Sequence, residues 1–154
     1  MPKAGTWVAL AGTALLANAY ANAQAASIPA PPQCLTEAAQ FHQVNVWVLR
    51  AIIWRESRNQ SDLISRNTDG SIDVGQAGIN SVHFGELAKY GIAPANLLNP
   101  CVATYVAAWH LARKMKRYGN TWAAVGSYNS ETPEKRQIYL ENIKAILRQW
   151  QVIQ

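Results

Sequence analysis

The chain has 154 residues, of which 49% are hydrophobic and 15% charged, so it can bury one ordinary globular core. This composition excludes collagen-like, fibrous and disordered chains. The formal net charge of +5 suits an anionic polymer, but the basic residues are too scattered to predict nucleic-acid binding, and the densest group, Arg113 to Arg117, lies where positive charge favours a helix end.

The N-terminus has the three-part layout of a cleavable secretory signal. Lys3 precedes an apolar stretch over 6–17, and small residues follow with two overlapping Ala-x-Ala sites, which place cleavage after Ala23 or Ala25. About twelve apolar residues fall short of the roughly 20 that span a bilayer, so we expect no stable membrane span after cleavage. A retained membrane anchor is the alternative. The pattern predicts a signal peptide over 1–25 and a periplasmic or secreted protein.

The ordered part of the chain is expected to be one domain over 34–154. It follows an extended, proline-rich lead-in over 26–33. A short helix is predicted over 36–42, and Asn45 is placed to cap a second helix over 46–57. This second helix is apolar almost all round, which indicates burial.

The next segment, 58–78, is rich in Asn, Asp, Ser and Gly and has no sustained period. We expect a long irregular loop or a small ribbon there, and loops of this length are often functional. A helix is predicted over 81–90, ended by Gly91, and a further turn over 94–98.

Three helices are predicted in the last third of the chain. A long one begins near Pro100 and ends near Tyr118, and a shorter one follows over 122–128. The last helix begins at 132–133 and presents an apolar face to the core, formed by Tyr139, Ile143, Ile146, Leu147 and Trp150. The fold is therefore expected to be mainly α, with one long loop in its first half.

One acidic residue stands on an apolar helix face. Ile53, Ile52 and Leu49 lie three, four and seven positions before Glu56, so its carboxyl projects from the same face as three aliphatic side chains. Desolvation raises a carboxyl pKa, and glycosidic bond cleavage needs a carboxylic acid that is still protonated near neutral pH. The pattern makes Glu56 a candidate acid. The alternatives are that it reaches water or pairs with a neighbouring arginine.

Several short motifs follow Glu56-Ser57 in order along the chain. They are Asp73-x-Gly75, Gly75-x-x-x-Ile79-Asn80-Ser81, Asn99-Pro100-Cys101 and Tyr118-Gly119-Asn120-Thr121-Trp122-x-Ala124-Val125-Gly126-x-Tyr128-Asn129. Together they resemble the lytic transglycosylases of the lysozyme-like superfamily, most closely the small specialised members that accompany secretion, conjugation and type IV pilus machines. The resemblance covers roughly 34–136.

The resemblance implies a lysozyme-like domain in which Glu56 is the single acid and base. It implies substrate contacts from the residues that match the family's Glu-Ser, Gly-Leu-Met-Gln-Ile-Asn and Ala-Tyr-Asn-Ala-Gly stretches. These are Ser57, Gln76, Asn80, Tyr128 and Asn129. The expected activity is cleavage of the β-1,4 bond between N-acetylmuramic acid and N-acetylglucosamine in peptidoglycan, with a 1,6-anhydro product, locally opening the wall for an envelope-spanning machine. No cofactor is expected.

The chain departs from the family in two places. Gln76-Ala77-Gly78 stands where the family has Leu-Met-Gln, and Ser130-Glu131 stands where it has Ala-Gly. The family glutamine is expected beside the acid, and Gln76 is a candidate to reach the same space. Two alternatives therefore stay open: a muramidase that uses water through Asp73 or Glu131, and a catalytically impaired peptidoglycan-binding assembly protein.

The two cysteines, Cys34 and Cys101, would both reach an oxidising compartment after export, where a disulfide is favoured over two unpaired thiols. The resemblance strengthens this pairing, because the specialised members carry matching cysteines. No metal site is expected, since the cysteines and histidines lack ligand spacing. The 67–73 segment is expected to form an Asx turn in preference to a calcium loop. His83 and His110 are expected to be surface or satisfied polar residues.

Overall fold

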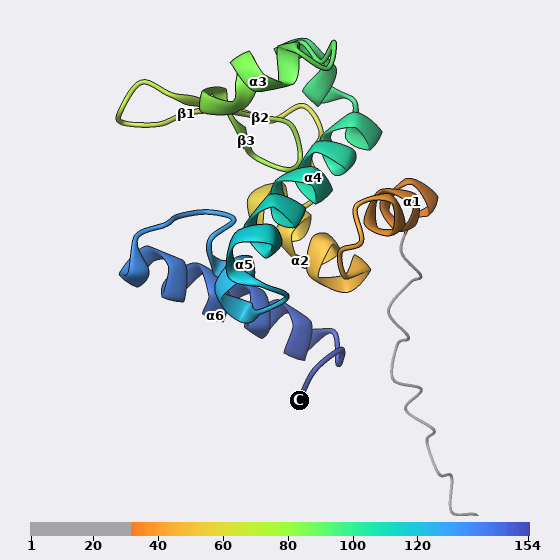
Figure 1. The fold of residues 1–154 in the computed structure, drawn as a ribbon, viewed down its shortest axis with the longest axis vertical. Coiled ribbons are helices and arrows are strands. Elements are labelled where there is room, and N and C mark those ends of the chain that lie inside the picture. The colour runs from red at the N-terminus through yellow and green to blue at the C-terminus, as the bar shows by residue number, and fades with distance from the viewer. Residues whose placement is uncertain (1–31) are drawn as a thin grey trace, which may run out of the picture.

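The computed structural model describes residues 32–154, and this part of the chain is mainly helical with one small sheet (Figure 1). This confirms the expected mainly α domain. The predicted signal peptide and most of the lead-in lie outside the described residues. Within them, no helix is both long and apolar enough to cross a membrane. The elements are α1 Gln33–Phe41, α2 Val46–Ser57, β1 Ile64–Arg66, β2 Ile72–Val74, β3 Ile79–Asn80, η1 Ser81–His83, α3 Phe84–Ala88, η2 Pro94–Leu98, α4 Pro100–Tyr118, α5 Trp122–Gly126 and α6 Pro133–Gln149.

The two ends of helix α2 are set by the residues that flank it. The Asn45 side chain accepts hydrogen bonds from the backbone N–H groups of Trp47 and Val48, as a cap does. Arg58 follows the last turn with a φ of 55°, which ends the helix. The helix packs against α1, α4 and α6, and its inner face is fully buried. The predicted burial is therefore confirmed for the face that carries the aliphatic residues before Glu56.

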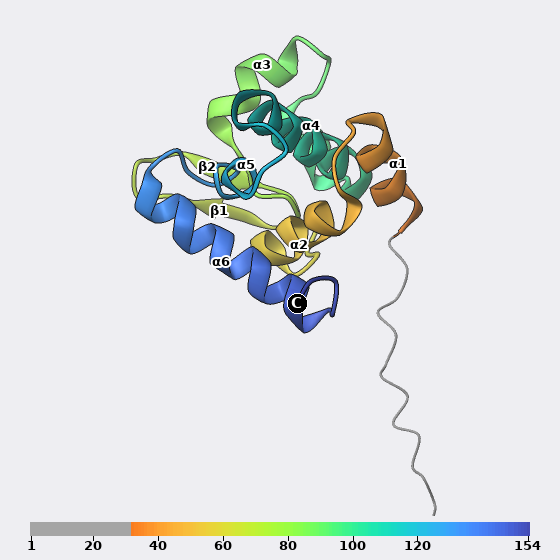
Figure 2. The ribbon, with the colours of Figure 1, turned by 60° about the horizontal axis from the view of Figure 1, so that its bottom comes forward.

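Helix α4 passes through the middle of the molecule, and α1 packs beside its first half (Figure 2). Asn99 caps it by accepting hydrogen bonds from two backbone N–H groups, and Pro100 occupies the first turn, where it costs no hydrogen bond. Cys34 of α1 and Cys101 of α4 form the expected disulfide, with a Cα–Cα distance of 5.7 Å. The bridge ties the start of the domain to the central helix.

The segment after α2 forms a small ribbon, which is one of the two structures predicted for it from the sequence. Its three antiparallel strands lie in the order β1-β2-β3, with Ser65 opposite Asp73 and Asp73 opposite Asn80. At the turn between β1 and β2, the Asp69 carboxylate accepts a hydrogen bond from the Ser71 N–H, which confirms the expected Asx turn. The α-helix expected over 81–90 is shorter than predicted. The first three residues form the 3-10 helix η1, and α3 covers only Phe84–Ala88.

Helices α5 and α6 complete the domain. Thr121 caps α5, and α5 itself ends at Gly126, two residues earlier than predicted. A Cβ on Gly126 would lie 2.7 Å from the Arg136 carbonyl oxygen, so only glycine allows the close approach of α6. The predicted inner face of α6 is confirmed, with Tyr139, Ile143 and Leu147 buried and Trp150 partly buried against the core.

Candidate active site

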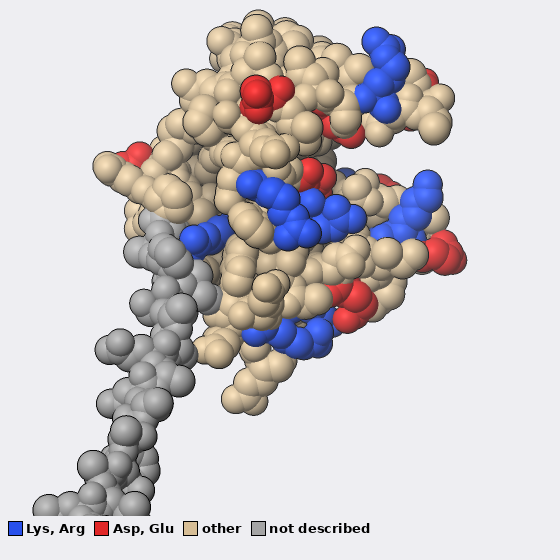
Figure 3. Space-filling model, turned by 180° about the vertical axis from the view of Figure 1, so that it is seen from behind, with Lys and Arg blue, Asp and Glu red and all other residues tan. Residues whose placement is uncertain are grey.

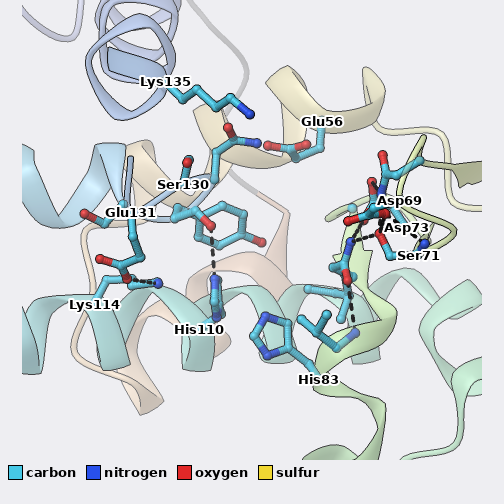
Figure 4. Close-up of a pocket in the computed structure, with 18 of the residues that line it drawn as sticks. Glu56, Asp69, Ser71, Asp73, His83, His110, Lys114, Ser130, Glu131 and Lys135 are labelled. Carbon is cyan, nitrogen blue, oxygen red and sulfur yellow. Dashed lines mark hydrogen bonds and ion pairs between the residues drawn. The ribbon is translucent and has the colours of Figure 1, made fainter. Parts of the chain in front are cut away.

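A deep cleft of about 580 Å³ separates the ribbon from the start of α6. The space-filling view shows it as a notch between two lobes, with charged side chains at its edges (Figure 3). The close-up shows residues from α2, the ribbon, α4 and the loop before α6 converging on it (Figure 4). Four predicted site residues line this cleft: Glu56, Asn80, Tyr128 and Asn129.

Glu56 lies one residue before the end of α2 and presents its carboxyl to the cleft floor. Its Oε1 accepts a hydrogen bond of 2.5 Å from the hydroxyl of Tyr139 on α6. Burial raises the pKa of Glu56 above its ordinary value; the Tyr139 hydrogen bond and the charge of Arg55 oppose this rise, and the charge of Asp73 adds to it. The net direction is upward, so the site favours the protonated acid.

The backbone of Gly78 packs directly against this carboxyl. Gly78 has a φ of +57°, and a Cβ there would lie 3.0 Å from Glu56 Oε2. A side chain at this position would be strained by this φ, and the carboxyl would have to give by a few tenths of an ångström. The departure from the family pattern therefore puts bare backbone beside the acid.

Ser57 and Gln76 are not brought to the cleft. The buried Ser57 hydroxyl donates a 2.8 Å hydrogen bond to the Gln76 carbonyl oxygen. The Gln76 side-chain amide points the other way and donates to the Pro100 carbonyl oxygen and to Thr104 Oγ1, both at 2.8 Å. Gln76 thus does not fill the space of the family glutamine, because its amide is held at the start of α4. Both residues instead fix the loop that carries Gly78.

Tyr128 also holds this loop. Its hydroxyl donates a 3.1 Å hydrogen bond to the Ala77 carbonyl oxygen, and its ring stacks on Tyr139 with centroids 6.3 Å apart. Burial, together with the charges of Glu56 and Asp73, raises the pKa of Tyr128 well above its ordinary value. Tyr128 therefore remains a neutral hydrogen-bond donor within the cleft wall.

The ribbon contributes a hydrogen-bonded polar group. Asp73 accepts amide hydrogen bonds from Asn80 at Oδ1, 2.8 Å, and from Asn67 at Oδ2, 3.0 Å. Asn80 also donates to Ser71 Oγ and caps η1 with its own oxygen. Both carboxylate oxygens of Asp73 therefore already accept hydrogen bonds from side chains of the same ribbon.

Glu131 lies at the cleft rim in a different environment. It pairs with the Lys114 ammonium at 2.5 Å and accepts a hydrogen bond from the Tyr118 hydroxyl. The Lys114 hydrogen bond, followed by the Tyr118 hydrogen bond, lowers the pKa of Glu131 below its ordinary value. Glu131 is therefore a charged, solvent-facing carboxylate.

His110 also lines the cleft, which the sequence interpretation did not foresee. Its Nε2 donates to the Tyr128 carbonyl oxygen at 3.1 Å, and its buried Nδ1 has no hydrogen-bond partner among the described residues. Burial and then the neighbouring His83, whose ring centroid lies 4.6 Å away, lower the pKa of His110 to about 4. The expectation of a surface or satisfied polar residue is confirmed for Nε2 of His110 and wrong for Nδ1. Its hidden position on α4 follows from packing that the sequence pattern does not reveal.

Tyr139 is the second residue that the sequence reading missed, because its helical spacing assigned it to the core. It is indeed buried, and its hydroxyl nevertheless contacts the acid. The available signal was its polar group, since a buried tyrosine hydroxyl needs a partner. No group of three or more His, Cys, Asp or Glu side chains that could hold a metal ion occurs in residues 32–154.

Comparison with known proteins gives a consistent result. A family model described as the transglycosylase SLT domain matches residues 33–146. The X polypeptide of Escherichia coli is 40% identical over 98 residues, which are 63% of this chain and 58% of that protein. Invasion protein IagB of Salmonella typhimurium (strain SL1344) is 40% identical over 104 residues, 67% of this chain and 65% of that protein.

A more distant relative covers more of both chains. Protein IpgF of Shigella flexneri is 32% identical over 119 residues, 76% of this chain and 78% of that protein. The chain thus spans less than two thirds of the length of the X polypeptide and of IagB, and more of IpgF.

Proposed function

The chain belongs to the transglycosylase SLT domain family, and from this premise we propose that it is a lytic transglycosylase that cleaves the glycan strands of peptidoglycan. The observation that carries the proposal is Glu56: one partly buried carboxyl, with a raised pKa and a tyrosine donor, on the floor of an open cleft. These are the properties required of an acid that protonates a leaving oxygen.

The proposed reaction uses Glu56 twice. The protonated carboxyl donates its proton to the oxygen of the β-1,4 bond after N-acetylmuramic acid, and the N-acetyl carbonyl oxygen assists at the anomeric carbon as that bond breaks. The resulting Glu56 carboxylate then accepts the proton of the C6 hydroxyl, whose oxygen closes on the anomeric carbon. The products are a new chain end and a 1,6-anhydro sugar, with no water consumed.

The surroundings of Glu56 support both steps. The Tyr139 hydrogen bond fixes one carboxyl oxygen, and the other lies beside Gly78, which has no side chain. Because the hydrogen bond favours the charged form while burial favours the neutral form, the carboxyl is suited to cycle between them. The cleft is also large enough to receive several sugar rings in succession, with a volume of about 580 Å³.

A hydrolytic muramidase needs a second carboxylate that activates water. Asp73 and Glu131 are the candidates, and both are engaged elsewhere: Asp73 by two amides, and Glu131 by Lys114 and Tyr118. The single-acid route therefore fits the described residues better. Gly78 places no side chain beside the acid, where the family has a glutamine. A second candidate function is therefore a peptidoglycan-binding protein with impaired catalysis.

We further propose that the protein is exported by its N-terminal segment and acts in the periplasm or outside the cell, opening the wall locally for a secretion, conjugation or pilus machine. The export pattern in the sequence supports the first part, and the similarity to a protein named as an invasion protein supports the second.

The test is digestion of purified sacculi by wild type, Glu56→Gln and Glu141→Gln. We expect Glu56→Gln to abolish release of soluble fragments, because the amide cannot donate or accept the required proton. Glu141→Gln, an exposed change on α6 away from the cleft, should digest normally. Mass spectrometry of the fragments should show 1,6-anhydro ends, lighter by one water than hydrolysis products. Hydrolysed ends would favour the muramidase, and binding without any release would favour the impaired protein.

A further inference from the structure

A second, smaller hollow opens from the cleft beside Glu56. It has a volume of about 180 Å³ and lies between the end of α2 and the start of α6. Glu56, Asn129 and Lys135 line both the hollow and the main cleft, so the two spaces meet at the acid. A substituent on a sugar held at Glu56 can therefore enter the hollow without leaving the cleft.

The hollow is flanked by two cations, Arg55 of α2 and Lys135 of α6. Both side chains are exposed, and neither forms an ion pair within residues 32–154. Arg55 contacts the Tyr139 ring, 6.0 Å from its centroid, and Lys135 extends over the cleft toward Glu56 (Figure 4). Two positive groups thus face one small space.

The other lysine that lines the main cleft is already matched with a carboxylate. Lys114 pairs with Glu131, and Arg113 pairs with Glu86. Their charges are compensated within the protein and are less available to a ligand. The contrast singles out Arg55 and Lys135 as the positive groups at the acid that are left for an outside anion.

We propose that Arg55 and Lys135 are specificity residues that bind a carboxylate carried by the muramyl residue undergoing cleavage. The inference rests on the proposed function and deepens it. The sugar rings of the glycan are uncharged, and its negative charge lies on the lactyl group of muramic acid or on the peptide attached there. Since the muramyl residue reacts at Glu56, that substituent is the anionic part of the substrate nearest the hollow.

Binding there would also act on the acid. The positive charge of Arg55 lowers the pKa of Glu56, and a carboxylate paired with Arg55 compensates that charge. The substrate that carries the carboxylate would then favour the protonated, reactive form of Glu56, whereas an uncharged oligosaccharide would not.

The test measures binding by calorimetry in the full chain carrying Glu56→Gln, so that no ligand is consumed. Arg55→Gln/Lys135→Gln is compared with Arg148→Gln/Lys89→Gln, which removes the same charge at exposed positions outside both spaces. Three ligands of equal length are used: glycan with its peptides, glycan stripped of peptides and therefore bearing the lactyl carboxylate, and an uncharged N-acetylglucosamine oligomer.

We expect the Arg55/Lys135 pair of changes to weaken binding of the anionic glycans roughly five- to ten-fold and to leave the uncharged oligomer unaffected. Raising the salt concentration should remove most of the difference. Loss for the stripped glycan alone assigns the lactyl carboxylate, and loss for the peptide-bearing glycan alone assigns a carboxylate of the peptide. Loss for both means that the site accepts a carboxylate from either source.

Equal weakening by the control pair, equal weakening for the uncharged oligomer, or no weakening would overturn the inference. The proposed function has its own readout, because it fails only if the wild-type protein releases no anhydro fragments from sacculi. A wild-type enzyme that digests normally, with binding indifferent to Arg55 and Lys135, refutes the carboxylate site alone.

Discussion

Glu56 and Glu131 line the same cleft, and each accepts a hydrogen bond from a tyrosine hydroxyl. Their pKa values are nevertheless shifted in opposite directions. On the floor, Tyr139 donates to Glu56, and at the rim Tyr118 donates to Glu131. The pKa of Glu56 is raised by burial, and that of Glu131 is lowered, first by its bond with Lys114. The tyrosine lowers the pKa in both cases, so the difference comes from desolvation on one side and an ammonium on the other.

On the proposed function, this difference separates the reacting carboxyl of Glu56 from the supporting carboxylate of Glu131. A carboxyl that is protonated near neutral pH can supply a proton, while a carboxylate paired with lysine is an ionic contact. A glutamate at the cleft edge is therefore not by itself a second catalytic group. Three changes probe the comparison, from the floor of the cleft to its rim.

The largest effect is expected from Tyr139→Phe, which removes the hydrogen bond donated to Glu56 Oε1 and keeps the buried ring. We expect the rate to fall about ten-fold, close to 1.4 kcal/mol, because the carboxyl loses its fixed orientation. The hydrogen bond lowers the pKa of Glu56, so its loss raises that pKa further. The alkaline limb of the pH–rate profile, where the acid loses its proton, should move to higher pH.

The matched control is Tyr118→Phe, which removes the equivalent hydroxyl from Glu131. We expect the pH–rate profile of this variant to coincide with that of wild type. A shift of equal size in both variants would mean that the floor and the rim are not electrostatically distinct.

A smaller effect is expected on stability from Glu56→Gln. A carboxyl whose pKa is raised by folding adds stability below its unfolded pKa, and this contribution is lost as the pH rises through the folded value. At pH 7, replacing it with a neutral amide should therefore increase the free energy of unfolding, by about 1 kcal/mol. The gain should shrink at pH 4, where Glu56 is protonated. Urea unfolding at both pH values measures it, and a less stable variant at pH 7 would contradict the raised pKa.

The sequence was sufficient to predict the helix that carries Glu56 on the floor of the cleft. Helical spacing placed Glu56 on an apolar face, and Asn45 caps the helix that it was expected to cap. These features depend on residues close together in the chain. The resemblance to a family then supplied the predicted role of Glu56 and strengthened the predicted pairing of the cysteines.

What the sequence did not reveal depends on contacts between distant segments. Tyr139 meets Glu56 across 83 positions, and only the packing of α6 on α2 brings them together. Gln76 was a candidate for the cleft, yet its amide is held by Thr104 on α4, 28 positions away. In both cases the direction of one side chain, rather than the existence of an element, decided the outcome.

The smallest effect is expected from Glu131→Gln at the rim. Because folding lowers the pKa of Glu131, its stabilising contribution is present above the unfolded pKa and lost as the pH falls through the folded value. The side chain is 42% exposed, so solvent screening should limit the loss at pH 7 to less than about 0.5 kcal/mol, vanishing at acid pH and in 1 M salt.

Digestion gives the decisive readout for the same variant. A lytic transglycosylase has no second carboxylate to lose, so Glu131→Gln should release 1,6-anhydro fragments from sacculi at nearly the wild-type rate. A water-using enzyme with Glu131 as its base would instead lose most of its rate, since the amide cannot accept a proton from water. A near-complete loss of digestion with the fold intact would therefore contradict the assignment of Glu56 as the single catalytic acid. Glu56 and Glu131 would then have to act as a pair.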